Sequence, residues 1–372
     1  MRKHSPLFYQ WKGRILHSGI HIFSHIRLLV RWVFYSVLIG CVMGLIGVAF
    51  VYAIQYATAW RKNFPWLLAL LPVGGLLIVW LYRITKDQND RGTNMVLASI
   101  RSEARLPVQM APLIFISTVV THLCGGSAGR EGAALQLGGS IGSMFGRLFR
   151  MQERDKHVMI LCGMSAAFSA IFRTPIAAPV FAMEVVCVGA MHYPALVPST
   201  IASLTASWLA GKLGIPLAKF SVQEIPPLQI VPSLKILLLG VLCAGVSVLF
   251  CILLHQTEKQ LHSRIQNPYL RILAASGMIW ILFLLVRNQD YLGIGTDVIG
   301  RAIAGDAVWY AFLMKILFTA VTLGGGFKGG EIVPSFFIGA VFGCCFGQIA
   351  GISPSFCASV GMVALFCGRS RW

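Results

Sequence analysis

Long stretches without a single charged residue constrain the fold of this chain more than any other feature. A bilayer core of about 30 Å is crossed by roughly 20 helical residues, so several of these stretches are long enough to span it. They are continuously apolar and do not alternate, which disfavours a barrel of strands. We therefore predict an all-α polytopic membrane protein with the lipid bilayer as its solvent. The charge-free stretches are Trp32–Trp60, Phe64–Tyr82, Leu106–Gly129, Val185–Gly211, Ile236–Thr257 and Ile332–Gly368. The last of these is too long for one crossing and must contain a break.

The charges that remain are mostly basic. Lys and Arg number 31 against 13 Asp and Glu, yet charged residues make up only 12% of the chain, about half the usual share of a soluble domain (roughly 25%). A net charge of +18 in a soluble protein would suggest nucleic acid. Here the first acidic residue is Asp87, and the basic residues that precede or border the first span follow the positive-inside pattern. We expect residues 1–31 to be a basic cytoplasmic segment, the protein to lie in a bacterial inner (cell) membrane, and no nucleic-acid partner. The early basic residues are Arg2, Lys3, Lys12, Arg14, Arg27 and Arg31.

Cysteine and histidine do not form a ligand pattern. The ten cysteines lack metal-type or redox spacing, so they are expected to be buried thiols that behave as small hydrophobic side chains. The nine histidines show no pairing. No Ser/Lys, His-Glu-x-x-His or paired-aspartate arrangement lies within the spans. We expect no metal, no other cofactor and no enzymatic activity.

Two glycine-rich clusters resemble each other and indicate an internal repeat. The first runs from Thr118-Val-Val-Thr121 through Gly125 and Gly126 to Gly129-Arg-Glu131, and the second from Thr319-Ala-Val-Thr322 through Gly324 to Gly330-Glu331. Glycines recur after each glutamate, at 139, 142 and 146 and at 339, 343 and 347. A Gly-Met pair follows in both halves, at 163 and at 361. Paired broken helices at corresponding places of two repeats point to the substrate site of a transporter.

The repeat divides the chain into a first unit over 32–225 and a second over 226–372. After Phe168 the first unit continues through two further apolar segments, whereas only six residues follow Phe366. We expect the second unit to be incomplete by roughly two helices. A truncated fragment that does not transport is therefore one alternative for the function.

The glycine-rich breaks predict an anion site. At membrane depth, unpaired backbone N–H groups are tolerated only where the backbone is buried or lines a cavity. At a helix start, these N–H groups and the positive end of the helix dipole attract an anion. Helices that begin near Glu131 and Glu331 would direct two such ends at one point. The Glu131 carboxylate could occupy the site itself and leave it to a halide when protonated, or it could only stabilise its own helix start.

These motifs resemble the CLC chloride channels and transporters. Gly129-Arg-Glu-Gly132 is similar to the GREGP signature of that family, Gly330-Glu-Ile-Val-Pro334 takes the place of its GxFxP motif, and Arg173-Thr-Pro through Glu184 resembles its APL helix. The resemblance implies inverted repeats of tilted and broken helices, and a homodimer with one ion pathway per subunit. It also implies that Glu131 is the gating glutamate that couples protons to the anion. The implied anion-binding residues are Thr93, Asn94, Met95, Gly129, Arg130, Gly132, Ala133, Gly330, Glu331, Ile332 and Val333.

Three departures from the family pattern favour its fluoride-exporting branch. The candidate for the GSGIP segment, Gly92-Thr-Asn-Met-Val96, lacks the serine-proline form of chloride-selective members. The inner proton-transfer glutamate is replaced by Val185, and the segment 326–331 differs from the common chloride filter. Against this branch, Ala133 and Val333 stand where hydroxyl side chains are expected. The sequence therefore predicts transport of chloride or fluoride, coupled to proton antiport, with a passive voltage-gated-type chloride channel as the alternative.

Overall fold

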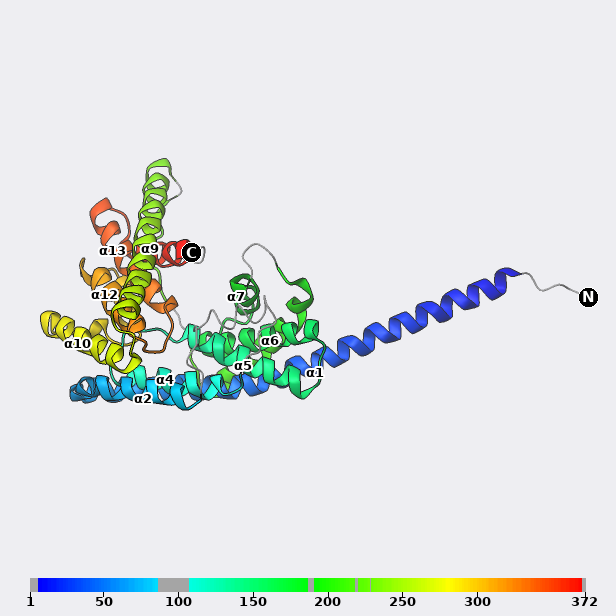
Figure 1. Cartoon of the computed structure of the whole chain (residues 1–372). Coiled ribbons are helices and arrows are strands. Elements are labelled where there is room, and N and C mark those ends of the chain that lie inside the picture. Colours follow the sequence, from blue (N-terminus) through cyan, green and yellow to red (C-terminus); the bar gives the residue numbers. More distant parts are fainter. Residues whose placement is uncertain (1–5, 86–106, 187–190, 218–219, 228, 370–372) are drawn as a thin grey trace, which may run out of the picture.

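A computed structural model of the chain describes residues 6–85, 107–186, 191–217, 220–227 and 229–369. In these ranges the chain is helical and contains no strand, and one long helix extends from the helical body toward the N-terminus (Figure 1). The α-helices are α1 (Pro6–Asn63), α2 (Leu71–Ile84), α4 (Met110–Leu123), α5 (Glu131–Leu148), α6 (Glu153–Phe172), α7 (Ala177–Val186), α8 (Leu196–Lys212), α9 (Ile230–Arg264), α10 (Pro268–Val286), α11 (Thr296–Ile303), α12 (Ala311–Gly324), α13 (Ile332–Ala350) and α14 (Pro354–Arg369). Three 3-10 turns join them, namely η1 (Pro65–Leu70), η2 (Tyr193–Ala195) and η3 (Gln289–Tyr291).

Six helical segments of the described residues are long and apolar enough to cross a membrane. The prediction of a polytopic all-α protein is confirmed, and so is the break expected within 332–368. The chain leaves α13 at Gly351, which has a left-handed φ of +65° that favours glycine, and α14 begins at Pro354. The six segments are Ile26–Asn63, Pro65–Ile84, Glu153–Phe172, Ile230–Arg264, Pro268–Val286 and Ile332–Ala350.

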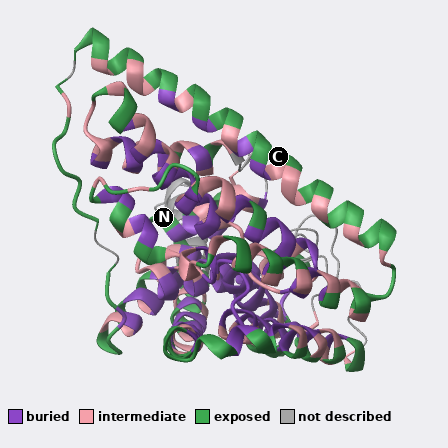
Figure 2. Ribbon diagram, turned by 90° about the vertical axis from the view of Figure 1, so that its left-hand side faces the viewer, coloured by how far each residue is buried: buried purple, intermediate pink, exposed green. Residues whose placement is uncertain are grey.

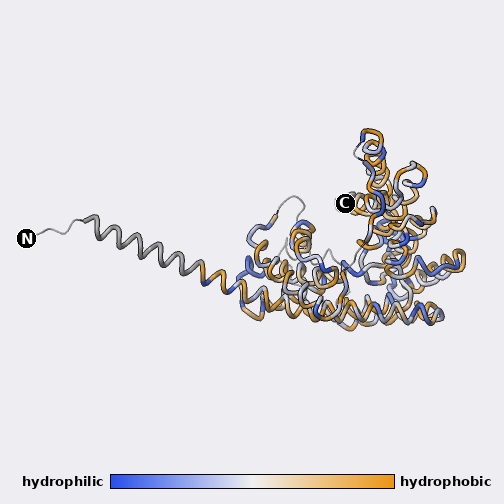
Figure 3. The backbone as a smooth tube through the Cα atoms, turned by 180° about the vertical axis from the view of Figure 1, so that it is seen from behind, coloured by the Kyte–Doolittle hydropathy of each residue, from blue (hydrophilic) through white to orange (hydrophobic). Residues whose placement is uncertain are grey.

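The outer helices present apolar side chains to their surroundings. Buried residues gather in the middle of the helical body, and exposed residues lie on its outer helices (Figure 2). On α9 and α10, exposed side chains include Leu237, Leu242, Ile281 and Leu284, and hydrophobic residues recur along the helices of the body (Figure 3). A soluble monomer rarely exposes so large an apolar surface, whereas lipid tails accommodate it. This surface is therefore suited to contact with lipid.

Glycines bring equivalent helix pairs of the two halves into close contact. A Cβ added at Gly138 on α5 would collide with the carbonyl of Gly163 on α6. In the same way, a Cβ added at Gly339 on α13 would collide with the carbonyl of Gly361 on α14. Small residues at such crossings allow the two helix backbones to touch. The paired helices support the internal repeat predicted from the glycine spacing.

The structure corrects the register of that repeat by one residue. Glu131 is the first residue of α5, whereas Glu331 is the N-cap of α13, whose first residue is Ile332. Glu131 is therefore equivalent in position to Ile332, and Arg130 to Glu331. With this alignment the contact glycines fall at the same positions in both helices, with Gly138, Gly142 and Gly146 matching Gly339, Gly343 and Gly347. Counting from the two glutamates misplaced the repeat because both are acidic and both stand at a helix start.

Candidate anion site at two helix starts

The two glycine-rich segments meet in the centre of the molecule. Gly129 and Gly330 form an isolated antiparallel bridge in which each backbone N–H donates to the carbonyl of the other, at 2.6 and 2.7 Å. The N-terminal ends of α5 and α13 start two residues after this bridge. The expectation that helices starting near Glu131 and Glu331 come together is therefore confirmed, and the bridge is the contact that joins them.

The same turn precedes each helix start. α4 and α12 end before Gly125 and Gly326, whose φ values of +94° and +103° lie in the left-handed region. In each turn a backbone N–H reaches back five residues, from Gly126 to the carbonyl of Thr121 at 2.8 Å and from Phe327 to that of Thr322 at 3.2 Å. This is the hydrogen-bond pattern of a glycine-ended helix. The repeated Thr-x-Val-Thr motif thus encodes a helix end.

Glu131 is fully buried, and its side chain lies at the start of α13, a helix of the second half. Its Oε2 atom accepts a hydrogen bond of 3.3 Å from the backbone N–H of Val333, in the first turn of α13. Its Oε1 atom is buried and has no hydrogen-bond partner among the described residues. The carboxylate of the first half therefore lies at the positive end of a helix from the second half, where an anion is stabilised by backbone N–H groups and the helix dipole.

Gly129 and Gly330 have no side chain, and this makes space for the Glu131 carboxylate. A Cβ added at Gly330 would come within 3.0 Å of Oε2 of Glu131 and 2.8 Å of the backbone N of Gly132. A Cβ added at Gly129 would collide with the same Oε2. Alanine would therefore displace the carboxylate or open the bridge. Both glycines are required by close approach, since neither has a positive φ.

The described residues among the others expected at this site lie at the two helix starts. Gly132 and Ala133 are buried in the first turn of α5, and Val333 is buried in that of α13, whereas Glu331 and Ile332 are partly exposed. Arg130 is the N-cap of α5 and holds its guanidinium 5.5 Å from the ring centre of Phe172. Thr93, Asn94 and Met95 lie outside the described residues.

A buried hydroxyl network joins the two halves beside the bridge, and sequence reasoning assigned it no role. The N–H of Ser127 donates to Oγ1 of Thr322 at 3.1 Å, and the Ser127 and Thr319 hydroxyls lie 3.1 Å apart. All three residues are buried. Both threonines belong to the second Thr-x-Val-Thr motif, so the sequence carries the signal, but the motif by itself indicates only the repeat.

Comparison with known proteins identifies the class to which this fold and site belong. The family described as voltage gated chloride channel matches residues 74–372. The chain therefore belongs to the CLC family of membrane proteins.

Two relatives and one solved structure show how similar this chain is to individual members of the family. A chloride/fluoride channel protein of Pseudomonas syringae pv. tomato is 30% identical over 350 residues, which cover 92% of this chain and 77% of that protein. An H(+)/Cl(-) exchange transporter of Vibrio cholerae, ClcA, is 26% identical, with coverage of 91% and 78%. Among solved structures, the crystal structure of a CLC-type fluoride/proton antiporter superposes with a TM-score of 0.87 at 31% identity, covering 92% of this chain and 87% of that one.

Proposed function

We propose that this protein carries a halide across the membrane in exchange for protons, with Glu131 as the gate. The observation that carries the proposal is the buried Glu131 carboxylate at the start of α13, hydrogen-bonded to the N–H of Val333. Ionisable groups at membrane depth mark ion and proton pathways. The similarity to an H(+)/Cl(-) exchange transporter and to a fluoride/proton antiporter supports this function.

The gate works by competition between two anions for one site. The deprotonated carboxylate is the anion that α13 holds, so it blocks a halide from the same N–H groups. Protonation removes the charge that attracts the carboxyl to the helix start, and its side chain can then leave. A halide takes its place, bound by the backbone of Val333 and its neighbours from Gly330 onward. Each exchange of halide for carboxylate is thereby linked to the movement of a proton.

We assign fluoride as the preferred halide. Fluoride is named for the antiporter structure and for the Pseudomonas relative, and the same preference follows from Val185 and the segment 326–331 in the sequence. Chloride is the competing halide. Efflux of each ion from the same proteoliposomes, followed with ion-selective electrodes, decides between them, and faster chloride than fluoride efflux would overturn the assignment.

We also propose the setting in which the transporter works. It functions as a homodimer in a bacterial cell membrane, with the basic segment 1–31 in the cytoplasm and two repeats over 32–225 and 226–372. The anion pathway includes Arg130, Gly132, Ala133, Glu331 and Ile332 around the two helix starts, and the segment Thr93–Met95. Light scattering of the purified protein in detergent tests the dimer, and protease access in intact cells tests the position of residues 1–31.

Proton coupling is tested by uphill transport. Purified protein is reconstituted into liposomes, and an outward halide gradient is imposed while the external pH is recorded. Proton uptake against its gradient, driven by halide efflux, is the expected result. Halide efflux that drives no proton movement would indicate the passive channel instead, a reading that the name of the Pseudomonas relative favours.

A further inference from the structure

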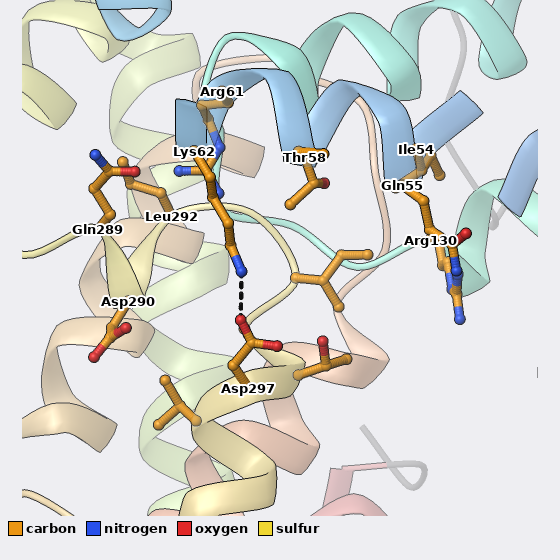
Figure 4. A pocket seen from close by; sticks show the side chains of 15 residues that line it. Ile54, Gln55, Thr58, Arg61, Lys62, Arg130, Gln289, Asp290, Leu292 and Asp297 are labelled. Carbon is orange, nitrogen blue, oxygen red and sulfur yellow. Dashed lines mark hydrogen bonds and ion pairs between the residues drawn. The ribbon is translucent and has the colours of Figure 1, made fainter. Parts of the chain in front are cut away.

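A cavity of about 340 Å³ lies between the C-terminal end of α1 and the segment that leads from η3 into α11. Side chains of α1, among them Thr58, Arg61 and Lys62, line one side, and most residues between Gln289 and Val298 line the other (Figure 4). Arg130, the residue before Glu131, also lines it. The cavity therefore shares a chain segment with the anion site at Glu131, but most of its lining residues are different.

Arg61 is a residue of this cavity lining with a buried charged side chain and unpartnered hydrogen-bond donors. Only 3% of its surface is exposed, and its Nε and Nη1 atoms are buried without a hydrogen-bond partner among the described residues. A buried guanidinium nitrogen without a partner loses its hydration and gains nothing in return, and buried charges in proteins are normally paired. Nε of Arg130 is also buried and unpartnered. Two cationic side chains of this lining therefore carry buried donor atoms that no described residue uses.

The acidic residues that line the cavity do not neutralise Arg61. Asp297 forms an ion pair with Lys62, drawn as a dashed line in Figure 4. Asp290 forms one with Arg301 and also accepts a hydrogen bond from its neighbour Asn288. Both carboxylates already have cationic or hydrogen-bonding partners. The unpaired charge of the cavity is thus positive.

Two further basic side chains lie behind this cavity. Lys315 of α12 is fully buried and donates to the carbonyls of Gly293 at 2.7 Å and Tyr291 at 3.3 Å. His122 of α4 is fully buried, and both its ring nitrogens lack a hydrogen-bond partner among the described residues. A Cβ added at Gly293 would lie 3.2 Å from Nη2 of Arg61 and 4.0 Å from Nδ1 of His122. Basic groups that come from α1, α4 and α12 therefore gather around the loop at Gly293.

We infer that this cavity is a second anion site, in which the Arg61 guanidinium binds a small monovalent anion next to Arg130. A guanidinium offers several N–H donors and stays charged, which suits it to bind an anion in a partly dry site. The anion would also offset the positive potential of Lys315. If the proposed transport function holds, the bound anion is the transported halide, held one step before the exchange at Glu131.

Bromide locates this site directly because it scatters anomalously and fits a cavity of this volume. Crystals of the wild-type protein grown in bromide are expected to show an anomalous peak within hydrogen-bonding reach of Arg61. The peak is expected to vanish in Arg61→Gln and to remain in Arg61→Lys, which keeps the charge. The control is Arg83→Gln, which should keep the peak. Arg83 is also basic, but it lies over the ring of Tyr269 and does not line the cavity.

An empty cavity in wild-type crystals would overturn the inference, and so would a peak that persists in Arg61→Gln. If Arg61→Gln does not fold, the wild-type map decides alone. A peak in the cavity of Glu131→Gln is also expected, since the site does not depend on that carboxylate.

Transport measurements test whether the site lies on the anion pathway. The halide concentration for half-maximal efflux should rise roughly tenfold in Arg61→Gln, the size expected for loss of a charged hydrogen-bond donor, and stay near the wild-type value in Arg61→Lys and Arg83→Gln. An unchanged halide dependence in Arg61→Gln would remove the site from the pathway. A wild-type protein that carries no halide would refute the proposed function, while the bromide map would still report on the cavity.

Discussion

The Oε2 atom of Glu131 accepts a hydrogen bond of 3.3 Å from the backbone N–H of Val333, which lies 202 residues further along the chain. The contact places a carboxylate from one half of the molecule at the helix start of the other half. A helix start is an anion site by its backbone alone, so the side chain and a free anion compete for the same N–H groups. This contact is the basis of the first prediction.

Replacing Glu131 by Gln should uncouple halide movement from protons. The amide has the shape of a protonated carboxyl but cannot exchange a proton at working pH. Halide efflux should persist, proton uptake should stop, and efflux should lose its rise toward acid pH, as measured by paired halide and pH electrodes. Glu153→Gln is the matched control, because Glu153 also begins a helix but pairs with Lys156 at an exposed position. Proton coupling that survives Glu131→Gln would refute the gate.

Replacing Gly330 by Ala should impair both the bridge and the gate. The new Cβ would approach the backbone N of Gly132 at 2.8 Å and Oε2 of Glu131 at 3.0 Å, so the two helix starts must separate. We expect a loss of about 1–3 kcal/mol of stability, the usual cost of overpacking, and slower efflux. Gly245→Ala on α9 is the control, since a Cβ there meets nothing within 4 Å. Equal melting temperatures and efflux rates for the two variants would contradict the close contact.

Alanine at Gly163 and at Gly361 should destabilise the protein to a similar extent. Each glycine faces the carbonyl of its partner, Gly138 or Gly339, in equivalent helix pairs. An added methyl group forces the helices apart, at a cost of about 1–3 kcal/mol. Gly277→Ala on α10, where a Cβ has open space, should leave the melting temperature near that of wild type. A strong effect at only one of the two positions would argue against equivalent packing in the repeat.

Replacing Thr322 by Val should weaken the junction of the two halves. Its hydroxyl accepts the N–H of Ser127 at 3.1 Å and donates to the carbonyl of Phe318 at 2.6 Å. Valine keeps the shape but leaves a buried N–H unpaired, which costs about 1–3 kcal/mol. Thr200→Val serves as the control, because that hydroxyl bonds only to the carbonyl of Leu196 one turn back in its own helix. Thermal unfolding in detergent compares the two, and equal stability would refute the role of this junction.

Much of the fold follows from local sequence. Charge-free runs predicted membrane helices, and the length of 332–368 required the break found at Gly351. The glycine clusters predicted two helix starts near Glu131 and Glu331. These inferences succeed because bilayer thickness, helix rise and the conformational freedom of glycine act over a few neighbouring residues. The one-residue error in the repeat arises because two glutamates stand at similar places in the sequence without being equivalent in the fold.

What the sequence by itself determined is therefore the helical membrane architecture, the repeat and the identity of Glu131 as a buried charge beside a helix start. Only the tertiary structure decided which N–H the carboxylate accepts, how Gly129 pairs with Gly330, and that the buried Arg61 and Lys315 both lie at the loop of Gly293. The physical reason is distance along the chain. Arg61 and Lys315 belong to no motif, and the potential at a point depends on every charge folded around it, whichever part of the chain it comes from.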